Sequence, residues 1–184
     1  HILGFTKVIG DIADGAKRVI LFFVAAFLLI TILVALYSQL FRLALIVVTC
    51  SLVAVFWQLG IIPLLGYGMD PMSILVPFLV FAIAVSHAVQ MVSAARSEVF
   101  IGVDSLTASR IAFRRLLAPG STALATDVIG FLTLLVIQIR GIQEIAIAAS
   151  LGVAVILLTN LVLLPVVLSY VRYPDNYHDR LQRR

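Results

Sequence analysis

The chain has 184 residues, of which 62% are hydrophobic and only 12% are charged, and its mean hydropathy is +1.17. Soluble domains contain roughly 45–50% apolar and about 25% charged residues, so this composition excludes an ordinary soluble domain and indicates an integral membrane protein. The formal net charge of +4 is small, and no basic run is interleaved with aromatic residues, which argues against nucleic-acid binding.

Five stretches are long and apolar enough to cross a bilayer, which needs roughly 20 mostly apolar residues. The sequence therefore predicts an all-α fold, a polytopic membrane helix bundle with five transmembrane helices. We place the spans at residues 19–37, 43–65, 71–95, 119–139 and 145–171. Residues 1–18 would form a lead-in segment at the membrane interface, residues 97–118 an interfacial helix, and residues 172–184 a basic tail.

Basic residues are distributed unevenly between the two sides of the predicted bundle. If the first span enters from outside, nine basic residues lie on the inner side and four on the outer side. The positive-inside rule then predicts a cytoplasmic C-terminal tail. We also expect the inner membrane of a bacterium, which the basic residues alone do not decide. The chain begins with His1 rather than Met, and we expect it to be part of a longer protein.

The two predicted interfacial segments have amphipathic patterns. In the first, apolar residues recur at spacings of three to four: Ile2, Phe5, Ile9 and Ile12. In the second, apolar residues are interspersed with arginines: Leu106, Arg110, Ile111, Phe113, Arg114, Arg115 and Leu117. Basic amphipathic helices of this kind lie in the plane of the lipid headgroups. The alternative is that each segment is a polar connector with a few apolar residues.

Prolines and small residues indicate where the helices begin, bend and pack closely. Pro71 and Pro119 are predicted near the starts of spans, where the missing N–H costs nothing, whereas Pro77 and Pro165 would kink their spans. Small residues on the last span would let another helix approach closely. They are Ala146, Ala148, Ala149, Ser150 and Gly152.

Two ionisable residues lie inside the predicted spans, His87 in the third and Asp127 in the fourth. Ionisable groups are costly within a bilayer, so each is a candidate functional residue. If the third span ends near Ala95 and the fourth begins near Pro119, each group lies roughly 12 Å from the inner end of its span. A histidine and a carboxylate would then lie at the same depth on neighbouring antiparallel helices.

Three interpretations of this pair stay open from the residues alone. The two groups could share a proton and couple its movement to transport, because histidine changes charge near physiological pH and an interacting pair titrates as a unit. They could instead form a fixed interhelical hydrogen bond, or the helices could turn these faces apart. Weaker polar residues could extend a proton path: Ser86, Gln90, Thr126 and Asn160. Gln58 is expected near a span end, where polarity costs little.

Several other chemistries lack their motifs in this sequence. No G-x-x-x-x-G-K-[ST] loop is present, so nucleotide binding of the Walker type is not expected. The three histidines are far apart and Cys50 is the only cysteine, so we expect neither a metal site nor another cofactor. Ser86 and His87 are adjacent on a predicted helix and point about 100° apart, which does not suit a hydrolase. We therefore do not expect an enzyme.

Several ordered motifs resemble one family of membrane transporters. They include Met69–Pro71, Gly130–Phe131, Ala149–Gly152 and Leu163–Pro165. Residues 66–98, GYGMDPMSILVPFLVFAIAVSHAVQMVSAARSE, resemble the fourth transmembrane helix of resistance–nodulation–division (RND) transporters of the MmpL or hydrophobe-exporter branch. Residues 121–168 resemble the two helices that follow, and residues 1–12 resemble the lead into the second helix. The resemblance implies helices two to six of one pseudo-repeat.

The resemblance has one departure, at the residues that would carry protons. Many such exporters have Gly-Val-Asp-Tyr in the fourth helix, with its aspartate in the proton relay, whereas this chain has Ala84-Val85-Ser86-His87. Asp127 stands in the next helix, where an uncharged residue is more usual. Either the relay has moved to His87 and Asp127, or this repeat has lost proton coupling and leaves it to the other half.

The expected function is export of hydrophobic or lipid-like molecules, driven by the proton-motive force. The resemblance implies several partners: membrane lipids, the hydrophobic substrate, a second repeat with a periplasmic domain, and periplasmic accessory proteins. The alternative is a non-transporting module, similar to a sterol-sensing domain, that binds lipid or a partner protein. A protein-export auxiliary of the same superfamily is a third and weaker candidate.

Overall fold

The computed structural model describes residues 5–38, 40–67 and 73–173, and these residues form helices without any β-strand. The α-helices are α1 (Phe5–Ser38), α2 (Phe41–Leu64), α3 (Val76–Phe100), α4 (Ser105–Thr133), α5 (Arg140–Leu158) and α6 (Leu164–Ser169). Two 3₁₀ turns, η1 (Ser73–Leu75) and η2 (Leu134–Val136), and a π-helix, η3 (Thr159–Leu163), complete the fold.

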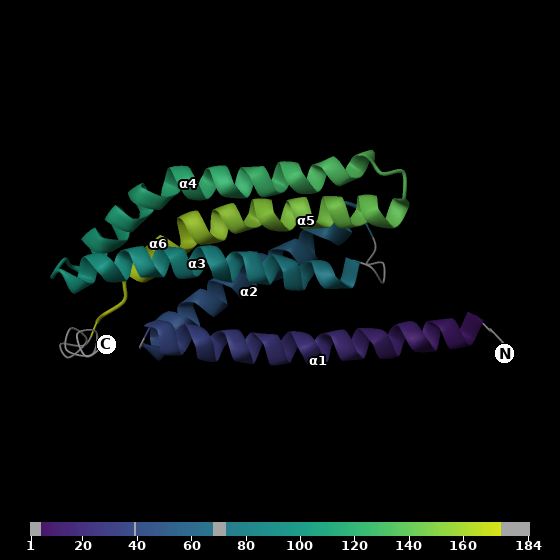
Figure 1. Ribbon diagram of the computed structural model, residues 1–184, viewed down its shortest axis with the longest axis horizontal. Helices are drawn as coiled ribbons and strands as arrows, with labels where there is room; N and C mark the ends of the chain where they lie inside the picture. The colour runs from purple at the N-terminus through teal and green to yellow at the C-terminus, as the bar shows by residue number, and fades with distance from the viewer. Residues whose placement is uncertain (1–4, 39, 68–72, 174–184) are drawn as a thin grey trace.

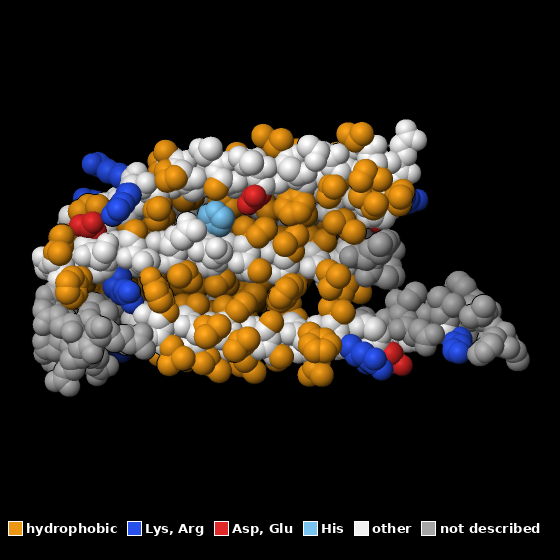
Figure 2. Space-filling view, in the orientation of Figure 1, with side chains coloured by type: hydrophobic (Ala, Val, Ile, Leu, Met, Phe, Trp, Pro, Cys, Tyr) orange, Lys and Arg blue, Asp and Glu red, His pale blue; other side chains and the backbone are white. Residues whose placement is uncertain are grey.

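The described residues contain five helical segments that are long and apolar enough to cross a membrane. They are Lys17–Ser38, Phe41–Leu64, Ser73–Phe100, Ser105–Val136 and Arg140–Ser169. This confirms the predicted all-α bundle with five membrane-spanning helices. Figure 2 agrees, because charged side chains gather toward the two ends of the long axis and apolar side chains cover most of its middle. The chain is therefore a multi-pass membrane protein.

The long helices run side by side, with α2 crossing them obliquely (Figure 1). In this view α1 lies along one edge of the bundle, α4 lies along the opposite edge, and α3 and α5 lie between them. We call the end with the start of α1 the N-terminal end, and the end with α6 the C-terminal end. Helices α3 and α5 thus have neighbours on both sides in this view.

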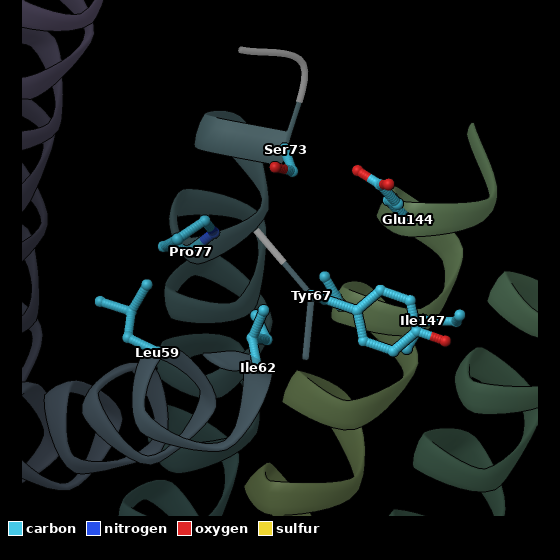
Figure 3. Close-up of a pocket in the computed structure, with 8 residues that line it drawn as sticks. Leu59, Ile62, Tyr67, Ser73, Pro77, Glu144 and Ile147 are labelled. Atoms are coloured by element: carbon cyan, nitrogen blue, oxygen red, sulfur yellow. The ribbon is translucent and has the colours of Figure 1, made fainter. Parts of the chain in front are cut away.

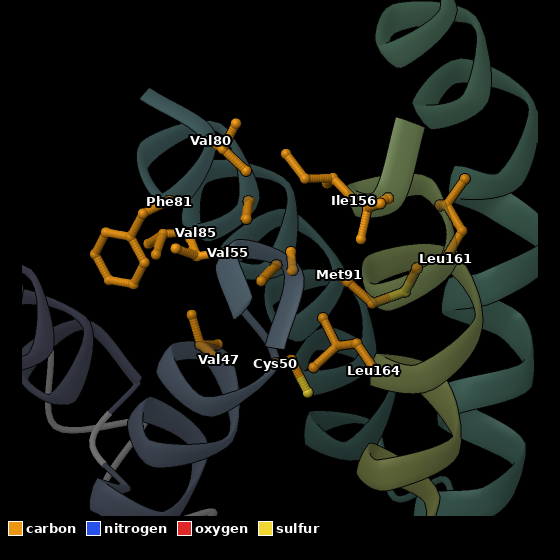
Figure 4. Close-up of a cluster of buried hydrophobic side chains, with 14 of the residues drawn as sticks. Val47, Cys50, Val55, Val80, Phe81, Val85, Met91, Ile156, Leu161 and Leu164 are labelled. Carbon is orange, nitrogen blue, oxygen red and sulfur yellow. The ribbon is translucent and has the colours of Figure 1, made fainter. Parts of the chain in front are cut away.

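The core lies between α2, α3 and the α5–α6 segment (Figure 4). Large side chains such as Phe81, Met91 and Leu164 are almost completely buried there. Between helices in lipid, close van der Waals packing supplies the stabilisation that the hydrophobic effect supplies in water. As predicted, the small residues of the last span are all buried: Ala146, Ala148, Ala149, Ser150 and Gly152.

Gly152 on α5 marks the closest approach of three helices. A Cβ atom at this position would collide with the Val80 side chain of α3 and would lie 3.0 Å from the amide nitrogen of Gln58 on α2. Interiors packed this tightly accommodate an added methyl group only by shifting their neighbours. The glycine therefore lets α5 settle against α2 and α3.

The structure differs from the sequence expectation around Pro119. Residues 97–118 do not form a separate interfacial helix: residues 97–100 end α3, and residues 105–118 are the first turns of α4, which continues through Pro119. The helix begins earlier because the Asp104 carboxylate accepts a hydrogen bond of 3.0 Å from the Thr107 N–H, which caps its first turn. This bond lowers the pKa of the Asp104 carboxyl from its usual value.

The N-terminal segment and Pro77 also differ from the sequence expectation. Residues 5–18 continue directly into α1 as one helix, while Ile2 and Pro71 lie outside the described residues. Pro77 does not kink a span, because it stands in the first turn of α3, where no intrahelical N–H is needed. Pro165 is the second residue after the π-helix, so the backbone irregularity predicted there takes the form of an extra-wide turn.

Candidate functional site

His87 lies near the middle of α3, which is a mostly apolar helix, and its side chain is half-buried. Its ring atom Nδ1 lies 3.1 Å from the Ile83 carbonyl oxygen, one turn earlier on the same helix. A carbonyl oxygen can only accept, so Nδ1 must carry the hydrogen in this bond. The other ring nitrogen, Nε2, then keeps its lone pair in the neutral form and is the atom that can take up a proton.

Asp127 lies on α4, which packs against α3, and it is also half-buried. No hydrogen bond or ion pair joins it to His87, since the ion pairs of the described residues are Lys17–Asp14 and Arg140–Glu144. Figure 2 shows a histidine and an acidic side chain near the middle of the α3 and α4 face, among apolar and uncharged groups. The two groups are thus carried by packed helices without direct bonding.

The prediction that His87 and Asp127 lie at the same membrane depth depends on Pro119 being the start of a span. Because α4 begins at Ser105 and runs through Pro119, that proline is not a helix end. Membrane depth must therefore be taken from the packing of α3 against α4 rather than from residue counts.

The weaker polar candidates divide into two groups. Ser86, Gln90 and Thr126 are exposed on the outer surface of the described bundle. The Thr126 hydroxyl donates to the Thr122 carbonyl of its own helix, over 2.9 Å. Asn160, in contrast, is 1% exposed in the core. The structure therefore does not bring the four residues together as one path.

Asn160 joins the last membrane segment to the helix that carries His87. Its side-chain nitrogen Nδ2 donates to the Ala84 carbonyl of α3 over 2.6 Å. Its side-chain oxygen is buried and has no hydrogen-bond partner. Asn160 lies in η3, and π-helical turns within longer helices occur frequently at functional sites. The contact holds the backbone directly before Ser86 and His87.

Gln58 is a buried polar residue whose importance the sequence interpretation missed. We expected it near a span end, where polarity costs little, but it is 0% exposed between α2 and α5. Its side-chain Nε2 donates to the Ala148 carbonyl over 2.9 Å, and its Oε1 is buried without a partner. A signal was available, because Gly152 stands one turn after Ala148 and leaves room for a long side chain from a neighbouring helix.

A small cavity lies at the N-terminal end of the bundle (Figure 3). Its volume is about 10 Å³, which is room for one water molecule. Ala148 lines it, so the cavity borders the residue that accepts the Gln58 hydrogen bond. Glu144 also lines it, with its side chain 17% exposed and one oxygen 3.0 Å from the Arg140 guanidinium. The remaining walls are formed mainly by Leu59, Ile62, Tyr67, Ser73, Pro77 and Ile147.

Sequence reasoning did not single out Glu144, although its side chain lines two openings at this end of the bundle. A wider opening of about 500 Å³ lies over the same end and shares Tyr67, Glu144 and Ile147 with the small cavity. Within the described ranges, no group of three or more His, Cys, Asp or Glu side chains could hold a metal ion.

Comparison with known proteins adds no family assignment. No protein-family model matches the chain, and no curated protein matches it.

Proposed function

We propose that this chain is the transmembrane part of a proton-driven, RND-type exporter of hydrophobic or lipid-like molecules. The observation that carries the proposal is a histidine and an aspartate, both half-buried, on two packed membrane helices. Ionisable groups at such positions are expensive in a bilayer and mark ion pathways in many transporters. The family resemblance supports a bacterial inner membrane as the location, and the distribution of basic residues supports a cytoplasmic C-terminal end.

The proton chemistry would use the free nitrogen of His87 and the carboxylate of Asp127. The Nδ1 bond to Ile83 leaves Nε2 as the atom that accepts a proton. Since no direct bond joins the two residues, a water molecule or a movement of α3 against α4 would carry the proton between them. One proton that moves down a potential of 100 mV releases about 2.3 kcal/mol, which is the driving energy for substrate movement.

The resemblance to RND transporters supports the same proposal from the sequence. It assigns the Ala84–His87 segment to the proton-relay helix, and it explains why Asp127 would be needed where Ser86 replaces the usual aspartate. The partners of such an exporter would be a second repeat, a periplasmic domain, periplasmic accessory proteins and the hydrophobic substrate.

The competing proposal is a non-transporting membrane module that binds lipid or a partner protein. The observation that favours it is the lack of a direct bond between His87 and Asp127, since a repeat without proton coupling needs no such pair. The two proposals differ in whether the protein's activity needs these two side chains and a proton gradient.

An extrusion assay in cells separates the two proposals. Cells expressing the full-length protein are loaded with N-phenyl-1-naphthylamine, a hydrophobic fluorescent probe, and its loss is followed with and without a protonophore. We expect extrusion that the protonophore abolishes and that His87→Ala or Asp127→Asn reduces at least ten-fold. Ser97→Ala is the matched control, because Ser97 is exposed on α3 and bonds only to the Ala94 carbonyl of its own helix. Normal extrusion by both relay variants, at equal expression, would sink the proposal.

A further inference from the structure

An apolar groove lies between the first turns of α4 and the η3–α6 segment. Its volume is about 280 Å³. Phe113 of α4 forms one side, and Leu161, Val162 and Pro165 form the other. The groove is therefore large enough, and its walls apolar enough, to hold part of a hydrocarbon chain.

Two polar side chains of α4 line this groove, and both have unused hydrogen-bond donors. Ser109 is only 4% exposed, yet its hydroxyl has no hydrogen-bond partner among the described residues. Its neighbour Arg110 is exposed and forms no ion pair within the described part of the chain. A ligand that fits must therefore supply acceptors, and an anionic one suits the guanidinium.

Contacts near both ends of the groove hold α4 against the segment that forms the opposite wall. At one end, the Ser105 hydroxyl donates to the Val171 carbonyl over 2.6 Å, which ties the start of α4 to the residues after α6. At the other end, Gly120 lies so close to Leu161 that a Cβ atom would be 3.3 Å from its Cδ2. Between these contacts, the π-helix and Pro165 change the course of the backbone opposite α4. The space is thus built into the fold of these elements.

The groove also lies at the depth where lipid headgroups are found. Helix α4 has 29 residues. At 1.5 Å per residue it is about 43 Å long, longer than the hydrocarbon core of roughly 30 Å. Its charged residues are confined to its first half, apart from Asp127, so that half extends toward the headgroups. Arg110 then lies at the boundary, with apolar walls leading from it toward the hydrocarbon.

We propose that this groove binds one anionic phospholipid of the surrounding membrane. An acyl chain lies along Phe113 and Val162, the phosphate accepts hydrogen bonds from Arg110, and an ester oxygen accepts one from the Ser109 hydroxyl. Charge complementarity favours this occupant, because other arginines at the same end are also exposed and form no ion pair with any residue that the structure describes: Arg42, Arg114, Arg115 and Arg172. Basic pockets between membrane helices bind acidic lipid headgroups for the same reason.

The test uses the full-length protein in nanodiscs with a phosphatidylglycerol that carries a photoreactive diazirine on one acyl chain. After irradiation and proteolysis, the yield of lipid on peptides covering residues 106–113 and 161–166 is measured by mass spectrometry. We expect labelling at least five-fold above that by the matching phosphatidylcholine. Arg110→Ala and Val162→Trp, which fills the groove, should each reduce labelling at least five-fold. Arg114→Ala should leave it within two-fold, because Arg114 does not line the groove.

Three results would overturn the proposal. Equal labelling by phosphatidylcholine would remove the role of the charge, and an equal loss in Arg114→Ala would show a diffuse attraction to a basic surface. Full competition by soluble glycerol 3-phosphate would show a phosphate site that needs no acyl chain. The readout does not depend on transport, so failure of the proposed export function leaves this inference standing, and the reverse is equally true.

Discussion

Asn160 donates its side-chain N–H to the backbone carbonyl of Ala84, and the two atoms lie 2.6 Å apart across the core. This bond joins η3 to α3 three residues before His87. Helix α3, which carries His87, is thereby bonded to the π-helical segment η3. The helix of the proposed proton site is thus tied to the last membrane segment by a buried side-chain hydrogen bond.

Replacement of Asn160 should therefore weaken the bundle. In Asn160→Ala we expect the free energy of unfolding to fall by about 1–2 kcal/mol, since both an interhelical hydrogen bond and part of the packing are lost. Reversible unfolding by dodecyl sulfate in mixed micelles measures this change. Ser97→Ala, which affects only a bond within one exposed turn, should leave the free energy within about 0.5 kcal/mol of wild type. Equal stability of Asn160→Ala and wild type would contradict the role given to this contact.

Two substitutions of Gln58 separate the contribution of its hydrogen bond to stability from the contribution of its side-chain volume. Its Nε2 is bonded to Ala148, but its buried Oε1 has no partner, so the gain and the cost partly cancel. Gln58→Met keeps the volume and removes both polar atoms, and we expect its stability within about 1 kcal/mol of wild type. Gln58→Ala also leaves a cavity and should cost about 2–4 kcal/mol. The same unfolding assay decides, and equal losses in both variants would show that the hydrogen bond, not the volume, matters.

Gly152 should not tolerate even a methyl group. In Gly152→Ala the added Cβ would meet Val80 and Gln58, and we expect a loss of about 1–3 kcal/mol in unfolding free energy. Gly130 on α4 is the matched control, because a Cβ at that exposed position has nothing within 4 Å. Gly130→Ala should be neutral or slightly stabilising, since alanine favours the helix. A Gly152→Ala variant as stable as wild type would show that α5 does not need this close approach.

The cap of α4 should make part of the stability depend on pH. Because the Thr107 N–H lowers the pKa of Asp104 in the folded protein, the ionised carboxylate stabilises the fold above its usual pKa of 3.8. This stabilisation should be lost as the pH falls through the lower folded-state value. Asp104→Asn retains an acceptor oxygen but does not ionise. The measurement is the difference in unfolding free energy between wild type and this variant from pH 7 to pH 3. The difference should shrink only below about pH 4. A difference that stays constant over this range would contradict the proposed role of the cap.

The sequence was sufficient for the spans but not for the boundaries of α4. Long apolar runs identify membrane helices reliably, because the bilayer demands both length and apolarity. Pro119 was read as a helix start, yet α4 continues through it. Proline inside a membrane helix is tolerated when nearby groups satisfy the backbone, and those groups depend on tertiary structure. The same limit applies to the depth of Asp127, which was counted from that proline.

The buried amides show a second limit of sequence reasoning. Asn160 was named as a weak candidate and Gln58 was set aside, although both lie in the core and bond to carbonyls of other helices. Periodicity does not reveal which face of an apolar helix meets a neighbour, because all faces of such a helix are apolar. His87 and Asp127 could be found from the sequence because charge in an apolar run is conspicuous whatever face it occupies.

His87 and Asp127 are proposed to carry protons across the membrane, and a measurement of proton flux through the purified protein can establish whether they do. The full-length protein is reconstituted into liposomes that contain a trapped pH-sensitive dye, and a potential is imposed with potassium and valinomycin. We predict a protein-dependent change in internal pH that His87→Ala and Asp127→Asn each reduce at least ten-fold, while Ser97→Ala retains it. Proton flux at the wild-type rate in both relay variants, with correct folding and orientation, would contradict the claim.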